Sequence, residues 1–171
     1  METTLQPTSI NHVLSRALDG ENSHVCMEKA LENLRLNVTG RKILNAPYTI
    51  WQLMKHVNYW QRKFINRLVG NEDVLLVCNW QEGWEDELNA ANQLEVDQEV
   101  TLLLESIEKA KVLLERQNDT TVIDDSYGCK HDVVQAMASH LSYHLGEIIL
   151  LRRIFGSWQQ PSNSGFYGIA K

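Results

Sequence analysis

Three histidines at two places in the sequence have the residue type and spacing to bind a metal ion. His140 and His144 are four residues apart in a segment with helical periodicity, so both rings lie on one side of that helix, one turn apart. A helix rotates by about 100° per residue, which places both rings within about 60° of the core-facing Met137. The same rotation places His56, in an earlier helical segment, beside the apolar stripe that begins at Leu53.

A divalent cation would satisfy one nitrogen of each imidazole, and imidazoles are costly to bury without partners. Three protein ligands leave one coordination position open for water or substrate, which is typical of catalytic rather than structural sites. A metal there lowers the pKa of a bound water or thiol and so generates a nucleophile near neutral pH. Glu147 is predicted to lie next to His140 and His144 as a fourth ligand, as an acceptor that orients a ligand, or as a base.

Each of these features also has a purely structural explanation. Two histidines four apart on a helix commonly bind no metal, and a single histidine on an apolar face, such as His56, is commonly a core residue with a hydrogen-bond partner. Glu147 is then a polar residue at the edge of the core. The remaining histidines carry less weight: His12 and His131 lie near expected helix beginnings, and His24 follows a helix break, where it could line the mouth of a bundle.

The elements that must position these residues are helices. Apolar residues recur with helical spacing in four segments, the first of which breaks at Asp19-Gly20: residues 10–34, 50–70, 97–116 and 131–155. Thr49 followed by Gln52 three residues later is the pattern of a capping box and marks the start of the second segment. Long helices without alternating strand patterns predict an all-α fold, an antiparallel four-helix bundle in a single domain over residues 1–171.

The connection over residues 71–96 is too long for a simple turn. It carries Trp80 and Trp84, and a short helix near residues 84–91 is one interpretation of its second half. Long connections commonly cover or line a functional site, so this one is a candidate for such a role.

Composition and charge exclude several classes of protein. A hydrophobic fraction of 43% in 171 residues indicates a folded chain, and a net charge of -6 with scattered basic residues argues against nucleic-acid binding. The apolar runs are too short for a membrane span, and no signal-peptide pattern is present. Cys26, Cys78 and Cys129 have no metal-type spacing and fit free thiols in a reducing compartment. We therefore expect a cytoplasmic protein that binds neither nucleic acid nor membrane.

Two stretches resemble the DinB-like (YfiT-like) superfamily, namely Thr49 to His56 and Ser139 to Trp158. They lie in the order and separation of that family, and its four-helix plan covers essentially the whole chain. The resemblance implies an up-up-down-down bundle with a long crossover. It also implies a divalent metal, commonly nickel or zinc, and frequent homodimers. Carried over to this sequence, the metal ligands are His56, His140 and His144.

Characterised members of this superfamily include S-transferases that use a low-molecular-weight thiol (bacillithiol, mycothiol or glutathione) and a mycothiol-dependent maleylpyruvate isomerase. The resemblance thus implies metal-dependent transfer of a thiol to a small electrophile. Two alternatives stay open: a metal-dependent hydrolase in which Glu147 acts as base, and a metal- or ligand-binding stress-response bundle without catalysis. Glu147 stands where many relatives have Gln, and the extra carboxylate would change the charge or coordination of the site.

Overall fold

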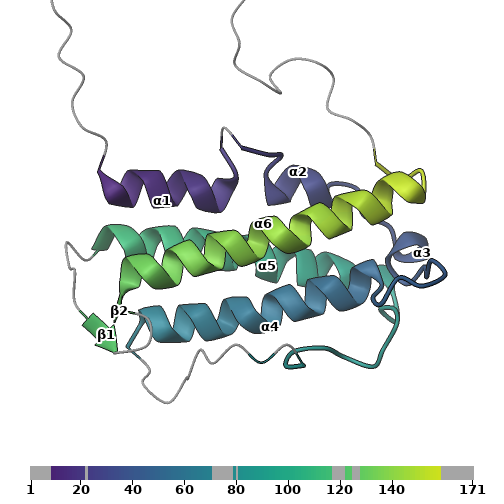
Figure 1. The fold of residues 1–171 in the computed structure, drawn as a ribbon. Helices are drawn as coiled ribbons and strands as arrows, with labels where there is room; N and C mark the ends of the chain where they lie inside the picture. The colour runs from purple at the N-terminus through teal and green to yellow at the C-terminus, as the bar shows by residue number, and fades with distance from the viewer. Residues whose placement is uncertain are drawn as a thin grey trace, which may run out of the picture.

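The structure, a computed structural model, describes residues 9–21, 23–70, 79, 81–116, 122–124 and 128–158. These residues are mostly helical, which confirms the all-α expectation, and no described helix is both long and apolar enough to cross a membrane. A short antiparallel ladder pairs the two strands (Figure 1). The elements are α1 (Ile10–Asp19), α2 (Met27–Leu31), α3 (Leu36–Thr39), α4 (Ile50–Leu68), α5 (Gln93–Arg116), β1 (Val122–Asp124), β2 (Gly128–Cys129) and α6 (Lys130–Ile154).

Helices α1 and α6 run in the same direction. Near the start of both helices, Nε2 of His131 lies 2.8 Å from Oδ1 of Asn11. Further along, Nε2 of His24, which follows α1, lies 2.7 Å from the hydroxyl of Ser142 in α6. Since sequence numbers rise together on the two sides, α1 and α6 are parallel neighbours.

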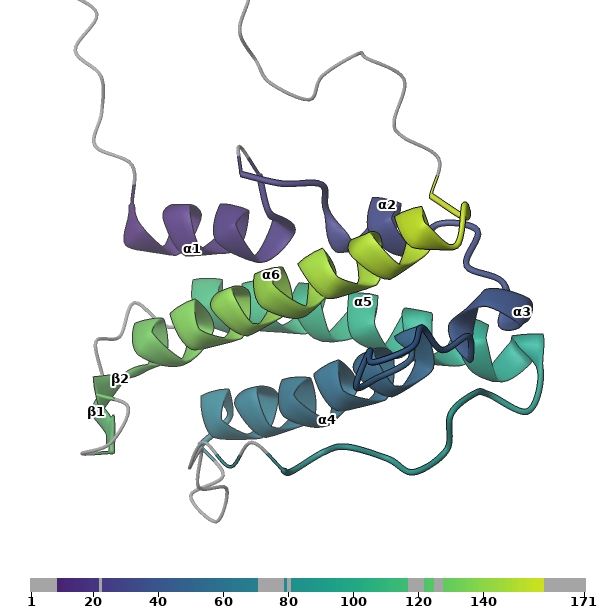
Figure 2. The ribbon, with the colours of Figure 1, turned by 45° about the vertical axis from the view of Figure 1, so that its right-hand side comes forward.

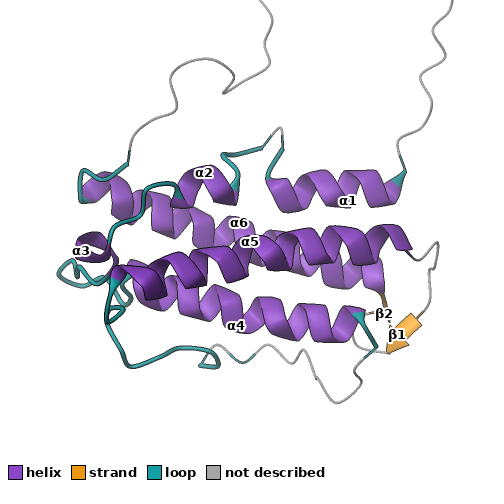
Figure 3. Cartoon of the chain, turned by 180° about the vertical axis from the view of Figure 1, so that it is seen from behind, coloured by secondary structure: helices purple, strands orange, loops and turns teal. Residues whose placement is uncertain are grey.

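Helix α4 runs against α6, and α5 runs alongside α4. The ring of His56, in the first half of α4, lies closer to that of His144 than to that of His140, whereas Phe64, two turns later, contacts the earlier His140. Figures 1 and 3 show α5 beside α4, with both helices starting at the same end of the molecule. The core lies between α1 and α2 on one side, α5 and α6 in the middle, and α4 on the other side (Figure 2).

The order of helix directions along the chain is therefore up, down, down, up, and the expected order up-up-down-down is wrong. The reason lies in the short helices between α1 and α4. Helix α2 continues almost in line with α1, and the chain turns back at α3 before it enters α4 (Figure 1). The long connection consequently joins two parallel helices, α4 and α5. In the expected order it would have joined two antiparallel helices.

Side-chain caps set the starts of α4 and α5. The predicted capping box of α4 is confirmed: the backbone N–H of Gln52 donates to the hydroxyl of Thr49 at 3.2 Å, and the side-chain oxygen of Gln52 accepts from the backbone N–H of Thr49 at 3.1 Å. Helix α5 begins at Gln93, earlier than expected, because Oδ1 of Asn92 accepts a hydrogen bond from the backbone N–H of Glu95 at 3.1 Å.

Two expectations about the non-helical segments have different outcomes. The break after α1 is confirmed, since Gly20 adopts a left-handed φ of 71° and ends the helix. The prediction of a short helix near residues 84–91 is wrong, because this segment runs without helical structure beside α4 (Figure 3). Its backbone and side chains bond to α4 and to α3 instead of to one another. Residues 71–78 and Trp80 of the same connection lie outside the described residues.

Candidate metal centre

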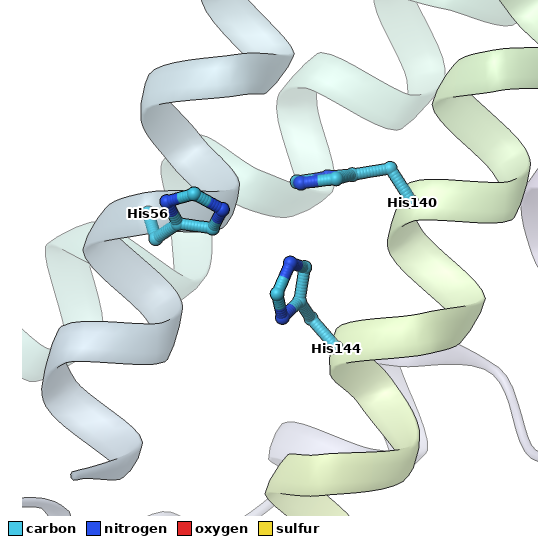
Figure 4. A group of neighbouring side chains, drawn as sticks. All are labelled: His56, His140 and His144. Carbon is cyan, nitrogen blue, oxygen red and sulfur yellow. The ribbon is translucent and has the colours of Figure 1, made fainter. Parts of the chain in front are cut away.

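The three predicted histidines meet in one place between α4 and α6. His56 comes from the second turn of α4, and His140 and His144 come from successive turns in the middle of α6, so that their rings point into a common space (Figure 4). One ring nitrogen of each residue lies within 4.8 Å of the others. The ring centroids are 4.5 Å apart for His140 and His144, 4.8 Å for His56 and His144, and 5.3 Å for His56 and His140.

This donor set fits one divalent cation. Imidazole nitrogens bind zinc at about 2.0–2.1 Å, so three nitrogens around one tetrahedral ion lie about 3.3 Å from one another. The observed nitrogens are within 4.8 Å, and rotations of the side chains by small angles would close the difference. Three imidazole donors suit zinc, nickel, copper and iron, and they leave a coordination position for a further ligand.

Burial keeps two of the three rings in the form that binds metals. It lowers the pKa of His140 to about 3, and the nearby rings of His144 and His56 lower it further. It also lowers the pKa of His56 to about 4, with a second contribution from His144, while backbone groups of Gly83 and Glu82 partly offset both effects. Both rings are therefore neutral at pH 7, and no proton has to leave before a cation binds.

Glu147 orients the third ring. Its carboxylate Oε2 lies 2.7 Å from Nδ1 of His144, and the side chains are 38% and 7% exposed, respectively. A carboxylate only accepts, so Nδ1 carries the proton and Nε2 keeps its lone pair for a cation. Of the three roles considered for Glu147, the geometry corresponds to the acceptor that fixes a ligand; a role as base stays a prediction.

Aromatic rings surround the three histidines. Trp60 and Phe64 of α4 are buried against His140, each with a ring centroid 6.1 Å from that of His140. From the long connection, Trp84 stacks on His56 with centroids 3.8 Å apart and planes 8° apart. The sequence predicts that Trp84 lies in a long connection, but it does not predict that Trp84 contacts His56. The one local sign of such a contact is a large aromatic residue in a largely polar segment.

The other histidines among the described residues do not join this cluster. His24 lies 2.9 Å from the carbonyl oxygen of Val25 and 2.7 Å from the hydroxyl of Ser142, so it ties the segment after α1 to α6 rather than lining an opening of the bundle. His131 is held by Asn11, and His12 is exposed.

The two described cysteines are also separate from the cluster. Cys129 provides the N-cap position of α6, and Cys26 provides that of α2. Both are free thiols. Cys78 lies outside the described residues.

Comparison with known proteins adds no family assignment to this geometry. The chain matches no family model, and neither the curated proteins nor the solved structures contain a significant match to it.

Proposed function

We propose that this chain is a DinB-like four-helix bundle whose imidazoles His56, His140 and His144 hold one divalent cation, nickel or zinc. The convergence of these three rings from two helices carries the proposal. Two further features support it: burial keeps His56 and His140 neutral, and Glu147 fixes the proton of His144 on the nitrogen that faces away from the site.

The activity that we propose is transfer of a low-molecular-weight thiol to a small electrophile. A bound divalent cation supplies Lewis acidity that lowers the pKa of a coordinated thiol toward neutrality. In the overall reaction the thiol sulfur forms a bond to the electrophilic carbon, the bond to the leaving group breaks with its electron pair, and the thiol proton is released. In this proposal Glu147, whose side chain is 38% exposed beside the site, accepts that proton.

Conjugation assays with single-histidine variants test this activity. Glutathione and an aryl chloride serve as probes, with the zinc- or nickel-loaded protein. We expect His144→Ala to lose conjugation with its helical content intact, whereas His12→Ala, which removes an exposed histidine outside the site, keeps the parent rate. An unchanged rate in His144→Ala would contradict the proposal. A product that forms equally well without thiol would indicate metal-assisted hydrolysis, and metal binding without turnover of any probe would indicate a non-catalytic bundle.

The remaining parts of the proposal are a homodimer, a small-molecule substrate and a cytoplasmic location. They follow from the resemblance and from the composition, not from a contact in the structure. Light scattering of the purified protein tests the dimer directly: a mass near twice 19.7 kDa is expected, and the monomer mass would contradict it.

A further inference from the structure

Tyr48, Trp84 and His56 form a continuous stack of three rings. The centroids of Tyr48 and Trp84 are 3.4 Å apart with planes 5° apart, and those of Trp84 and His56 are 3.8 Å apart with planes 8° apart. A ring packed face to face in this way cannot turn about its Cβ–Cγ bond without leaving the stack. The stack therefore fixes the plane in which the nitrogens of His56 lie.

Among the described residues, His56 has no carboxylate partner of the kind that Glu147 provides for His144. Metal-binding histidines ordinarily donate their second ring N–H to a carboxylate, a carbonyl or a water, as His144 does to Glu147. Nδ1 of His56 is buried and makes no hydrogen bond of ordinary geometry within the described residues, although backbone groups of Gly83 and Glu82 lie close enough to raise the pKa of the ring. The face-to-face contact with the indole ring of Trp84 is the shortest ring contact that His56 makes.

The segment after Trp84 is fastened to the first turn of α4. The side-chain amide of Gln52 donates to the backbone carbonyl of Glu85 at 2.7 Å. The hydroxyl of Thr49 donates to the backbone carbonyl of Leu88 at 2.8 Å. Both donors belong to the capping box of α4, so the same two side chains that start the helix also fix the connection on it.

The segment before Trp84 is fastened about two to three turns further along α4. The carboxylate of Glu82 accepts a hydrogen bond from the hydroxyl of Tyr59 at 3.2 Å and pairs with the ammonium group of Lys63. Gly83 has a left-handed φ of 78°, and a Cβ at this position would lie 2.5 Å from the ring of Tyr59. Trp84 thus stands between two attachment points on the helix that carries His56.

We propose that Trp84 is a positioning residue of the metal site: clamped between Tyr48 and His56 by this anchored segment, it fixes the His56 ring and sets the affinity of the site for its cation. The inference rests on the proposed metal site and assigns the long connection its role in it. Losing an orienting partner of a metal ligand typically lowers metal affinity by about 10–100-fold. We expect a loss of that size when the indole ring is removed.

Zinc titration of three variants tests this role, with zinc affinity measured by competition with a chromophoric chelator. We expect Trp84→Leu to raise the zinc Kd by about 10–100-fold and Trp84→Phe, which keeps a flat ring in the stack, to raise it by less than about tenfold. Trp158→Leu is the matched control, because Trp158 is also partly buried but lies over Arg152 at the end of α6. Its zinc Kd should equal that of the parent.

Thermal unfolding of the zinc-free proteins separates positioning from stability. If Trp84 only stabilised the fold, Trp84→Leu would lower the Tm and leave the zinc affinity of the folded protein unchanged, and this result would overturn the inference. Should Trp84→Leu not fold, Tyr48→Leu loosens the indole ring from its other face, and an unchanged zinc Kd in that variant would equally overturn it. A parent protein that binds no zinc would instead refute the metal site itself, which distinguishes the two failures.

Discussion

Replacing Glu147 by alanine is expected to weaken metal binding about tenfold while the fold stays intact. The carboxylate accepts the Nδ1 proton of His144 at 2.7 Å, and without it the His144 ring is free to rotate and to move its proton to the other nitrogen. Removal of such an orienting partner typically costs 10–100-fold in affinity, or about 1.4–2.7 kcal/mol. The Glu147 side chain is 38% exposed, so water replaces part of the lost hydrogen bond and the lower figure applies.

Two further variants sharpen this test. Glu147→Gln keeps a side-chain oxygen that accepts from Nδ1, so its loss of zinc affinity should be only a few-fold, about half or less of the free-energy change in Glu147→Ala. Glu105→Ala removes an exposed glutamate of α5 that is not part of the metal cluster, and it should bind zinc like the parent. All four proteins are compared at pH 7.5 by chelator competition, with circular dichroism as the check on folding.

Two results would refute the reasoning. A zinc Kd in Glu147→Ala equal to that of the parent would show that the carboxylate does not orient His144. Complete loss of bound zinc in Glu147→Ala, as severe as in a variant that lacks one of the histidines, would show that Glu147 is a fourth ligand instead of an acceptor.

Three other changes have expected outcomes. Because burial lowers the pKa of His140 to about 3 from its ordinary 6.5, the unfolded chain binds a proton below pH 6.5 that the zinc-free native protein does not. His140 should therefore lower the free energy of unfolding by at most about 2 kcal/mol between pH 6.5 and pH 5, and His56, whose pKa is also lowered, adds a similar fall. His140→Gln should remove the part that is due to His140; urea unfolding with a chelator present measures both. Thr49→Ala should lower the free energy of unfolding by about 1–2 kcal/mol, because it removes the hydroxyl that caps α4 and donates to the carbonyl of Leu88. Thr49→Ser keeps a hydroxyl for both hydrogen bonds and should change the free energy of unfolding little in the same assay. Arg152→Met should lower the free energy of unfolding by about 3 kcal/mol, because it leaves the backbone carbonyls of Ala30 and Glu32 without their donor, while the zinc stoichiometry should match the parent. Arg153→Met, at an exposed position, is the control. Equal unfolding midpoints for the two variants would contradict the role of the buried guanidinium.

Local patterns in the sequence were sufficient to predict the helices and the side of each helix that faces the core. The rotation of about 100° per residue, which depends on one helix alone, is enough to predict that the core-facing side of each helix carries His56, His140 and His144. The start of α4 follows from two residues, Thr49 and Gln52, whose bonds close within a single turn. The start of α5 at Gln93 has an equally local signal, because Asn92 precedes Glu95 by three residues, the spacing of a side-chain cap.

Features that depend on contacts between distant segments could not be read from such patterns. The direction of α4 relative to α1 depends on how α2 and α3 turn the chain, and neither of these short helices has a side-chain cap that marks its start. The stack of Tyr48 and Trp84 on His56 joins a loop before α4 with the connection after it. Aromatic rings can stack on many flat partners, so the position of an aromatic residue in the sequence does not predict which ring it stacks on.

Metal analysis of untagged protein tests the central claim most directly. The parent and a variant carrying His56→Ala, His140→Ala and His144→Ala are incubated with zinc or nickel, freed of excess metal and measured by elemental mass spectrometry. We expect about one equivalent of metal in the parent, as for a single three-histidine site, and none in the variant. A parent without bound metal after both incubations would contradict the account and leave the three histidines as residues of the core.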